Sequence, residues 1–147
     1  MMNPVALEKL RKYCAYQDRC HKEVRTKLIQ LQVYGDDLEE VMSHLISEDF
    51  LNEERFARSF ARGKFRMKRW GRIKIKIELK KRYVSDYCIR KGMEEIDEVA
   101  YDETIQYLIK KHKLFSKNIG PLNRKKISES LYRKGFEWEF INKGFVN

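Results

Sequence analysis

The sequence predicts an all-α fold, and two observations carry this prediction. First, five apolar positions at offsets 0, 4, 9, 14 and 18 occur three times along the chain, 51 and then 52 residues apart. The fifteen positions are Val24, Leu28, Val33, Leu38 and Met42, then Ile75, Leu79, Val84, Ile89 and Met93, then Ile127, Leu131, Phe136, Ile141 and Phe145. Second, the 147 residues include only seven glycines and two prolines against 37% charged residues, which favours helices over a turn-rich β fold. A repeat of this length indicates tandem helical units whose function lies along an extended face.

The first repeat covers residues 1–51 and is expected to hold three helices. Asn3 can cap free backbone N–H groups and Pro4 tolerates the first helical position, so a helix should begin here. Asp36 and Asp37 place negative charge at the N-terminus of the third helix, where it is stabilising. The expected helices span about residues 4–17, about residues 20–31, and residues from 36 onward.

The second repeat covers residues 52–96, and its middle segment is ambiguous when it is considered alone. Residues 72–79 alternate apolar and polar side chains, which is typical of a half-buried strand. The repeat overrides that interpretation, because the corresponding segments of the other repeats do not alternate and the spacing of four between Ile75 and Leu79 belongs to a helix. The expected helices are one from Asn52 to about Lys68, one over residues 72–79, and a short one capped by Ser85.

The third repeat covers residues 97–147 and departs from the other two. A helix should start near Asp97 and be followed by a longer loop over residues 112–123, which contains a Gly-Pro pair. A helix that carries Ile127 and Leu131 and a short last helix should complete the repeat.

The chain shows no sign of a membrane or secretory segment. No stretch approaches the roughly 18 uninterrupted apolar residues of a membrane span, and the N-terminus lacks the apolar region of a secretion signal. We therefore expect a cytoplasmic protein that contacts no membrane. Cys14, Cys20 and Cys88 are odd in number and form no C-x-x-C pair, so we expect reduced, packed thiols rather than disulfides or a zinc site.

Catalytic motifs have little support in this sequence. Cys20 and His21 are neighbours, and neighbouring side chains point apart on a helix, so they do not form a nucleophile and base pair there. His44 and His112 lack a carboxylate or cysteine partner at a metal-ligand spacing. The sequence also contains no Gly-rich phosphate loop. We predict a protein that is not an enzyme and uses neither a metal nor a cofactor.

The net charge of +10 is concentrated in the second repeat. Residues 55–91 hold fifteen Lys or Arg and two acidic residues, whereas residues 36–54 hold eight acidic residues and residues 94–103 hold six, with no Lys or Arg in either flank. Such a run is often only a solvated surface. Because the end of one helix and the start of the next should bring these charges to one corner, we expect contact with nucleic-acid phosphates. The candidate contact residues are Arg62, Lys64, Arg66, Lys68, Arg69, Trp70, Arg72, Lys74 and Lys76.

Five aromatic residues could stack on unpaired bases, although aromatics at helical spacing more often belong to a core. They are Tyr13, Tyr16, Phe65, Trp70 and Tyr83. Trp70 is the best stacking candidate, because it lies within the basic stretch. No zinc finger, homeodomain or other base-reading motif is present, so readout of a base sequence is not expected.

Two adjoining segments resemble the RecX family of bacterial recombination regulators. The first is Phe50-Leu51-Asn52-Glu53-Glu54-Arg55-Phe56-Ala57, and the second is Arg69-Trp70-Gly71-Arg72-Ile73-Lys74-Ile75-Lys76-Ile77-Glu78-Leu79. The similarity covers nearly the whole chain, and its third repeat matches only loosely. Three departures are Asn52 in place of the usual aspartate, Cys20 in place of a serine, and Arg82-Tyr83-Val84 in place of lysine-glycine-isoleucine. The last of these removes a glycine from the turn between the fifth and sixth helices.

The resemblance implies three tandem three-helix repeats that form an elongated, curved molecule lying along the groove of a RecA filament on single-stranded DNA. It also implies a non-enzymatic regulator that lowers the ATPase and strand-exchange activity of the recombinase, and so affects DNA repair and the SOS response. We expect it to be a monomer. Two alternatives stay open: a general nucleic-acid-binding helical-repeat protein without a recombinase partner, and an adaptor that uses only its acidic and apolar faces.

Overall fold

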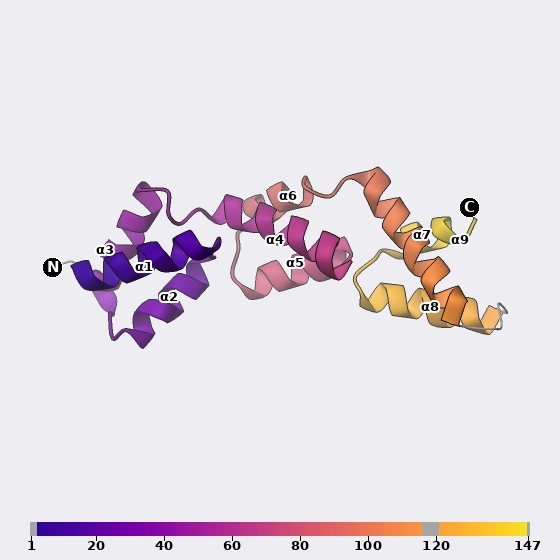
Figure 1. Ribbon diagram of the computed structural model, residues 1–147, viewed down its shortest axis with the longest axis horizontal. Helices are drawn as coiled ribbons and strands as arrows, with labels where there is room; N and C mark the ends of the chain where they lie inside the picture. The colour runs from indigo at the N-terminus through magenta and orange to yellow at the C-terminus, as the bar shows by residue number, and fades with distance from the viewer. Residues whose placement is uncertain (1–2, 116–120, 147) are drawn as a thin grey trace. The chain divides into compact units, whose positions relative to one another are not determined.

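The computed structural model describes residues 3–115 and 121–146, and this part of the chain folds into nine α-helices with no strand (Figure 1). The helices are α1 (Pro4–Tyr16), α2 (His21–Gln30), α3 (Gly35–Ser47), α4 (Glu53–Lys68), α5 (Arg72–Lys81), α6 (Asp86–Met93), α7 (Glu98–Phe115), α8 (Pro121–Arg133) and α9 (Trp138–Val146). The all-α prediction is therefore confirmed. Within the described residues, no helix is long and apolar enough to cross a membrane.

The alternating segment at residues 72–79 is helical, as the repeat predicts. In α5, Ile75 and Leu79 are fully buried, whereas Ile77 between them is 49% exposed. The helix thus separates residues that a strand would have placed on the same face.

The loop predicted over residues 112–123 is wrong at both of its ends. Helix α7 continues to Phe115, and α8 already begins at Pro121. Proline at the first position of α8 is compatible with a helix, because the N–H that it lacks would have no partner there. The middle of the predicted loop, residues 116–120, lies outside the described residues.

Four helices begin with an N-cap residue whose side chain forms a hydrogen bond to the helix. The side chains of Asn3, Asn52, Ser85 and Asp97 each accept from a backbone N–H three residues later, at 3.1, 2.9, 3.2 and 2.9 Å. Each bond satisfies one N–H group that the first turn of a helix leaves open. Asn52 therefore caps α4 although it replaces the usual aspartate of the related family.

The chain divides into two compact units, which we describe separately. Unit 1 comprises Met1–Phe60 with Leu79–Gly92, and unit 2 comprises Ala61–Glu78 with Met93–Asn147. Helices α4 and α5 each contribute to both units. The boundaries of the three sequence repeats stay a prediction, since this division follows compactness rather than repeat length.

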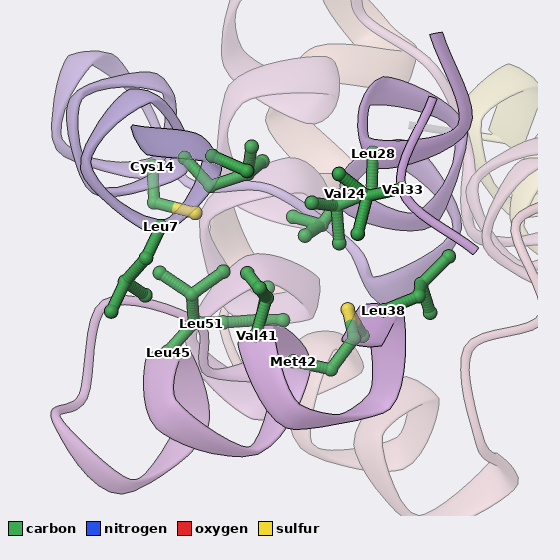
Figure 2. Close-up of a cluster of buried hydrophobic side chains, with 12 residues drawn as sticks. Leu7, Cys14, Val24, Leu28, Val33, Leu38, Val41, Met42, Leu45 and Leu51 are labelled. Carbon is green, nitrogen blue, oxygen red and sulfur yellow. The ribbon is translucent and has the colours of Figure 1, made fainter. Parts of the chain in front are cut away.

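The core of unit 1 is a cluster of aliphatic side chains between α1, α2 and α3 (Figure 2). Figure 2 shows the labelled side chains of these helices pointing toward one another. Its fully buried members include Leu10, Val24, Leu28, Val41 and Leu45. Burying a side chain of this size stabilises the fold by about 1.5–3 kcal/mol, so the cluster is the main source of stability in this part of the unit.

The core of unit 2 is built around the aromatic ring of Tyr101, which is fully buried. Its ring centroid lies 5.8 Å from that of Phe65, 5.2 Å from that of Phe136 and 5.4 Å from that of Phe140. Aromatic pairs at such distances contribute beyond their buried area. The residues come from α4, from α7, from the α8–α9 turn and from α9, so this cluster joins the parts of the unit.

The sequence repeat has a structural counterpart in the way three helices end. Gln32, Tyr83 and Gly135 follow α2, α5 and α8, and their φ angles are 62°, 57° and 101°. The next residue in each case donates its N–H to a carbonyl five positions earlier, in the pairs Val33 to Leu28 (2.9 Å), Val84 to Leu79 (3.2 Å) and Phe136 to Leu131 (3.2 Å). This is the Schellman motif, in which a left-handed residue ends the helix and two apolar residues meet across the turn. The second and third of the five repeated apolar positions are therefore the two residues that this hydrogen bond joins in each repeat.

The turn between α5 and α6 forms without the glycine that the related family carries. Tyr83 adopts the left-handed conformation itself, and its side chain is 79% exposed. A side chain in this region costs roughly 1–2 kcal/mol relative to ordinary backbone angles. The buried Leu79 and Val84 pair on either side of the turn stabilises the reversal against this cost.

Two glycines of unit 2 bring the α4–α5 turn into direct backbone contact with the α8–α9 turn. The Gly71 N–H donates to the carbonyl of Lys134 at 2.8 Å, and the Ile73 N–H donates to the carbonyl of Gly135 at 2.9 Å. A Cβ atom on Gly71 would lie only 2.3 Å from the carbonyl carbon and oxygen of Gly135. The contact therefore requires glycine at position 71.

The substitution Gly71→Ala should lower the free energy of unfolding by about 3 kcal/mol or more, because the added methyl group meets backbone atoms that cannot move aside. Gly63→Ala is the matched control, since a Cβ at position 63 meets nothing within 4 Å in the middle of α4. This control should raise the free energy of unfolding by about 0.5–1 kcal/mol. Urea denaturation followed by circular dichroism measures both, and similar stability of the two variants would contradict the close contact.

The substitution Tyr83→Gly should raise the free energy of unfolding by about 0.5 kcal/mol, because the relief of left-handed strain exceeds the entropy that glycine loses on folding. Lys80→Gly, an exposed position inside α5, should instead lower it by about 0.5–1 kcal/mol. Thermal and urea unfolding of the two variants check the opposite signs. A loss of stability in both would argue against strain at Tyr83.

Candidate nucleic-acid interface

The nine candidate contact residues lie on both sides of the α4–α5 turn, and all belong to unit 2. We call them the basic corner: Arg62, Lys64, Arg66, Lys68, Arg69, Trp70, Arg72, Lys74 and Lys76. Helix α4 ends where Arg69 adopts a left-handed conformation, with φ of 53°, and its N–H donates to the carbonyl of Phe65 at 3.1 Å. This turn places the basic last turn of α4 next to the basic start of α5.

Three members of the basic corner are exposed cations. Arg66, Lys68 and Lys76 are exposed, and none of them forms an ion pair within the described part of the chain. Cations that lack a carboxylate partner keep their full charge available to an external anion. These three residues are therefore the most accessible members of the predicted contact surface.

Trp70 lies between two lysines of the basic corner. The ammonium groups of Lys64 and Lys74 lie 5.0 and 4.5 Å from the centroid of its ring. Cations at this distance from an aromatic ring are attracted to the partial negative charge on the faces of the ring. Because Trp70 is only partly exposed, the arrangement indicates that the ring positions the two lysines, in addition to any stacking on a base.

Two arginines of the basic corner are engaged by acidic residues of the same unit. Arg62 forms an ion pair with Glu95, with an N–O distance of 2.5 Å, and Arg72 forms one with Glu137 at 3.3 Å. The side chain of Arg72 is only 15% exposed. Its guanidinium carbon also lies 3.9 Å from the centroid of the Tyr101 ring. Arg72 thus packs against the core of unit 2 and is not a freely accessible contact residue.

Tyr101 connects the start of α5 to this ion pair. Its hydroxyl accepts the backbone N–H of Arg72 at 3.0 Å and donates to the carboxylate of Glu137. Burial, followed by the hydrogen bond to Glu137, raises the pKa of Tyr101 well above its usual range. The hydroxyl therefore stays protonated at every physiological pH and keeps this network closed.

The structure adds two lysines to the site that the sequence did not indicate. Burial first, and then the charges of Lys111, Lys74 and Arg69, lower the pKa of Lys134. The guanidinium carbon of Arg69 lies 4.4 Å from the centroid of the Tyr107 ring on α7. Lys111 and Lys134 come from α7 and from the α8–α9 turn, and no local pattern in the sequence connects them with Arg69 and Lys74.

The family-like segment at residues 50–57 has a structural role in unit 1. Arg55 donates to Asp18 at 2.8 Å and to Asp49 at 3.1 Å, and it also reaches the carbonyl of Asp49 at 3.0 Å. Ala57 is fully buried, and a Cβ on Gly92 would lie 2.9 Å from its carbonyl oxygen. The segment therefore fixes the start of α4 and its packing against α6, and Arg55 is not available as a contact cation.

The three cysteines are packed in the protein interior, as the sequence predicts. Cys14, Cys20 and Cys88 are buried and not joined by a disulfide. Burial raises the pKa of the Cys14 and Cys20 thiols to about 11, so both are protonated and unreactive at neutral pH. Within residues 3–115 and 121–146, no group of three His, Cys, Asp or Glu side chains is arranged to hold a metal ion.

Unit 1 also carries a hollow of about 410 Å³ beside α2 and the α5–α6 turn. It is lined by His21, Lys22, Arg25, Thr26, Ile29, Glu53, Arg82 and Tyr83. Its charges are partly compensated, because Arg25 is bound by Glu39 at 2.6 Å and Glu53 lies inside the hollow. The basic corner is therefore the stronger candidate for an anionic ligand.

The aromatic candidates divide between core and surface. Phe65 is buried and Tyr13 is partly buried, whereas Tyr16 and Tyr83 are 83% and 79% exposed. Tyr16 and Tyr83 belong to unit 1, whereas the basic corner belongs to unit 2. Trp70 remains the one predicted stacking candidate that both lies in the basic corner and is accessible in part.

Comparison with known proteins relates the chain to one group. A family model described as RecX, second three-helix domain, matches residues 52–93. The regulatory protein RecX of Bacillus cereus strain B4264 is 30% identical over 130 residues, which cover 88% of this chain and 48% of that protein. The chain thus spans about half the length of this relative. The regulatory protein RecX of Prosthecochloris aestuarii is 28% identical over 136 residues, which cover 92% of this chain and 88% of that protein.

Solved structures give the same result. The crystal structure of RecX from Lactobacillus salivarius superposes with a TM-score of 0.87 at 26% identity, covering 96% of this chain and 92% of that one. A second crystal structure, of a regulatory protein RecX, has a TM-score of 0.86 at 17% identity and covers 97% of this chain and 70% of that one. The second likeness concerns the fold alone.

The substitution Arg72→Ala should lower the free energy of unfolding by about 2–3 kcal/mol, because it removes a charged hydrogen bond and leaves the partly buried Glu137 without its cationic partner, with only the Tyr101 hydroxyl donating to it. Lys76→Ala is the control on the same helix, and it should change stability by less than about 0.5 kcal/mol because Lys76 is exposed. Chemical denaturation distinguishes the two. Equal stability of both variants would mean that Arg72 is an ordinary surface cation.

Proposed function

We propose that this chain, which is similar to RecX proteins over most of its length, is a regulatory protein of that family that binds the RecA recombinase filament on single-stranded DNA and lowers its activity. It acts by binding rather than by catalysis, as a monomer in the cytoplasm. By occupying the RecA filament, the protein affects recombination and DNA repair.

The observation that carries this proposal is the charge of the basic corner. Arg66, Lys68 and Lys76 are exposed without ion pairs in the described residues, and they lie on helices that a rigid core supports. Cations in this arrangement neutralise phosphates and release counterions, so they favour contact with DNA or with the DNA-bearing groove of a filament.

The division into three repeats belongs to the same proposal, with bounds at residues 1–51, 52–96 and 97–147. The match of a second three-helix domain to residues 52–93 supports the middle repeat. The acidic flanks at residues 36–54 and 94–103 are suited to contacts with basic surfaces of filament subunits, while the middle repeat lies near DNA.

A general nucleic-acid-binding protein is the second candidate, since the same exposed cations would bind bare single-stranded DNA without any recombinase. An adaptor that uses only its acidic and apolar faces would bind DNA negligibly. Unlike the proposed RecA regulator, neither of these two kinds of protein would change the ATPase of a recombinase.

The triple variant Arg66→Glu, Lys68→Glu and Lys76→Glu should abolish the effect on the single-stranded-DNA-dependent ATPase of the cognate RecA, because it reverses the accessible charge without touching the core. The wild-type protein should lower this ATPase at concentrations too small to coat the DNA. Binding to bare single-stranded DNA is followed in parallel at the same salt concentration.

The matched control reverses three exposed lysines outside the basic corner, Lys9→Glu, Lys12→Glu and Lys126→Glu. It should inhibit nearly as well as the wild type, and circular dichroism should show that both variants are folded. Normal inhibition by a folded basic-corner variant would refute the site. An unchanged ATPase with strong binding to bare DNA would favour the second candidate, and no response in either assay would favour the adaptor.

A further inference from the structure

Four cationic side chains of unit 2 converge where the α4–α5 turn meets the α8–α9 turn: Arg69, Lys74, Lys111 and Lys134. The backbone carbonyl of Lys134 accepts the N–H of Gly71 at 2.8 Å. A Cβ on the neighbouring Gly135 would lie 2.5 Å from the backbone nitrogen and from the Cβ of Lys74. Lys74 and Lys134 are therefore attached to segments in direct contact, although they are far apart in the sequence.

Helix α7 brings the other two cations to the same place. The guanidinium carbon of Arg69 lies 4.4 Å from the centroid of the Tyr107 ring. Lys111 lies four residues after Tyr107 on α7, and residues at this spacing are neighbours on a helix surface. The next residue, His112, has its Nε2 3.4 Å from the Oγ of Ser130, which holds this part of α7 against α8 close to Lys134.

No acidic side chain compensates these charges within the described residues. None of the four cations forms an ion pair there, whereas Arg62 and Arg72 nearby bind Glu95 and Glu137. The other three cations lie close enough to Lys134 to disfavour its charged form. Burial and the charges of Lys111, Lys74 and Arg69 lower the pKa of Lys134, and burial with Lys111 and Lys134 lowers that of His112. A cluster of like charges that costs stability in the free protein is relieved by a bound anion.

We propose that Arg69, Lys74, Lys111 and Lys134 form a phosphate-binding site whose ligand is the phosphodiester backbone of single-stranded nucleic acid. This inference rests on the proposed function, because it adds a defined phosphate contact to the basic corner. A polymer of phosphates fits better than a free phosphate ion, since Arg69 and Lys74 also belong to the basic corner, which carries the exposed cations Arg66, Lys68 and Lys76 on the same two helices and their turn. One strand can therefore occupy the site and continue along the corner.

The first test removes the two lysines that belong only to this site, in the full-length variant Lys111→Gln and Lys134→Gln. Binding of a fluorescent thymidine 15-mer is measured by anisotropy over a series of salt concentrations, with no recombinase present. The variant should bind on the order of tenfold more weakly at low salt, and the slope of log K against log salt should fall by roughly 0.7 for each lost phosphate contact. Urea denaturation should show stability no lower than that of the wild type, because the variant loses only repulsive charges.

The matched control is Lys110→Gln and Lys125→Gln, which removes one exposed lysine from α7 and one from α8. It should retain most of the affinity and of the salt slope. Equal losses in the two double variants would overturn the proposal, because the effect would then be one of net charge alone.

A second measurement reports on the site itself. The lysines are labelled by reductive ¹³C-methylation, and the pKa of Lys134 is followed by NMR in the presence of the thymidine 15-mer, inorganic pyrophosphate or a polyglutamate peptide. The 15-mer should raise this pKa. A rise with pyrophosphate alone would overturn the nucleic-acid source in favour of a free phosphate, and a rise with polyglutamate alone would overturn it in favour of an acidic protein surface.

The two proposals fail separately. Loss of binding to the 15-mer in the Lys111 and Lys134 variant, together with an unaffected RecA ATPase in the wild type, would leave the phosphate site standing and reject the filament. Inhibition that depends on Arg66, Lys68 and Lys76, with no change of 15-mer binding in the Lys111 and Lys134 variant, would reject only the phosphate site.

Discussion

The Schellman turn that ends α2, α5 and α8 is the local constraint on which the packing of this chain depends. A single left-handed residue reverses the backbone, and the two apolar residues on either side of it meet across the turn, as Leu28 and Val33 do. The direction in which the next helix leaves is set by this reversal. The same turn joins α5 to α6, where the Val84 N–H donates to the carbonyl of the buried Leu79.

Much of the helical fold could be predicted from the sequence, because the periodicity of apolar residues is a local signal. The repeat identified α5 as a helix although residues 72–79 alternate like a strand, and it did so through the spacing of Ile75 and Leu79. The loop over residues 112–123 was wrong, since glycine and proline mark a boundary without giving its length. Proline in fact opens α8 rather than interrupting it.

The candidate site could be predicted only in part, because its charges differ in what surrounds them. Local sequence placed nine residues around one turn, but it could not separate exposed Lys76 from Arg72, whose partners Tyr101 and Glu137 come from distant segments. Lys111 and Lys134 were missed for the same reason. Their proximity to Arg69 and Lys74 arises from tertiary contacts, and no spacing in the sequence encodes it. Counting basic residues near one turn thus overstates the accessible charge at Arg72 and leaves out the charges of Lys111 and Lys134.

The contact between Gly71 and Gly135 is made by backbone atoms alone, and this affects how the chain can change over evolutionary time. The hydrogen bonds from Gly71 and Ile73 use no side-chain atoms, so the contact between the two turns does not depend on the charged side chains around it. Exposed cations nearby, such as Arg66, Lys68 and Lys76, can be gained, lost or exchanged without changing these hydrogen bonds. A lineage could therefore change the charge of this surface to suit a different strand or filament while inheriting the same scaffold, provided that the glycines at positions 71 and 135 are kept.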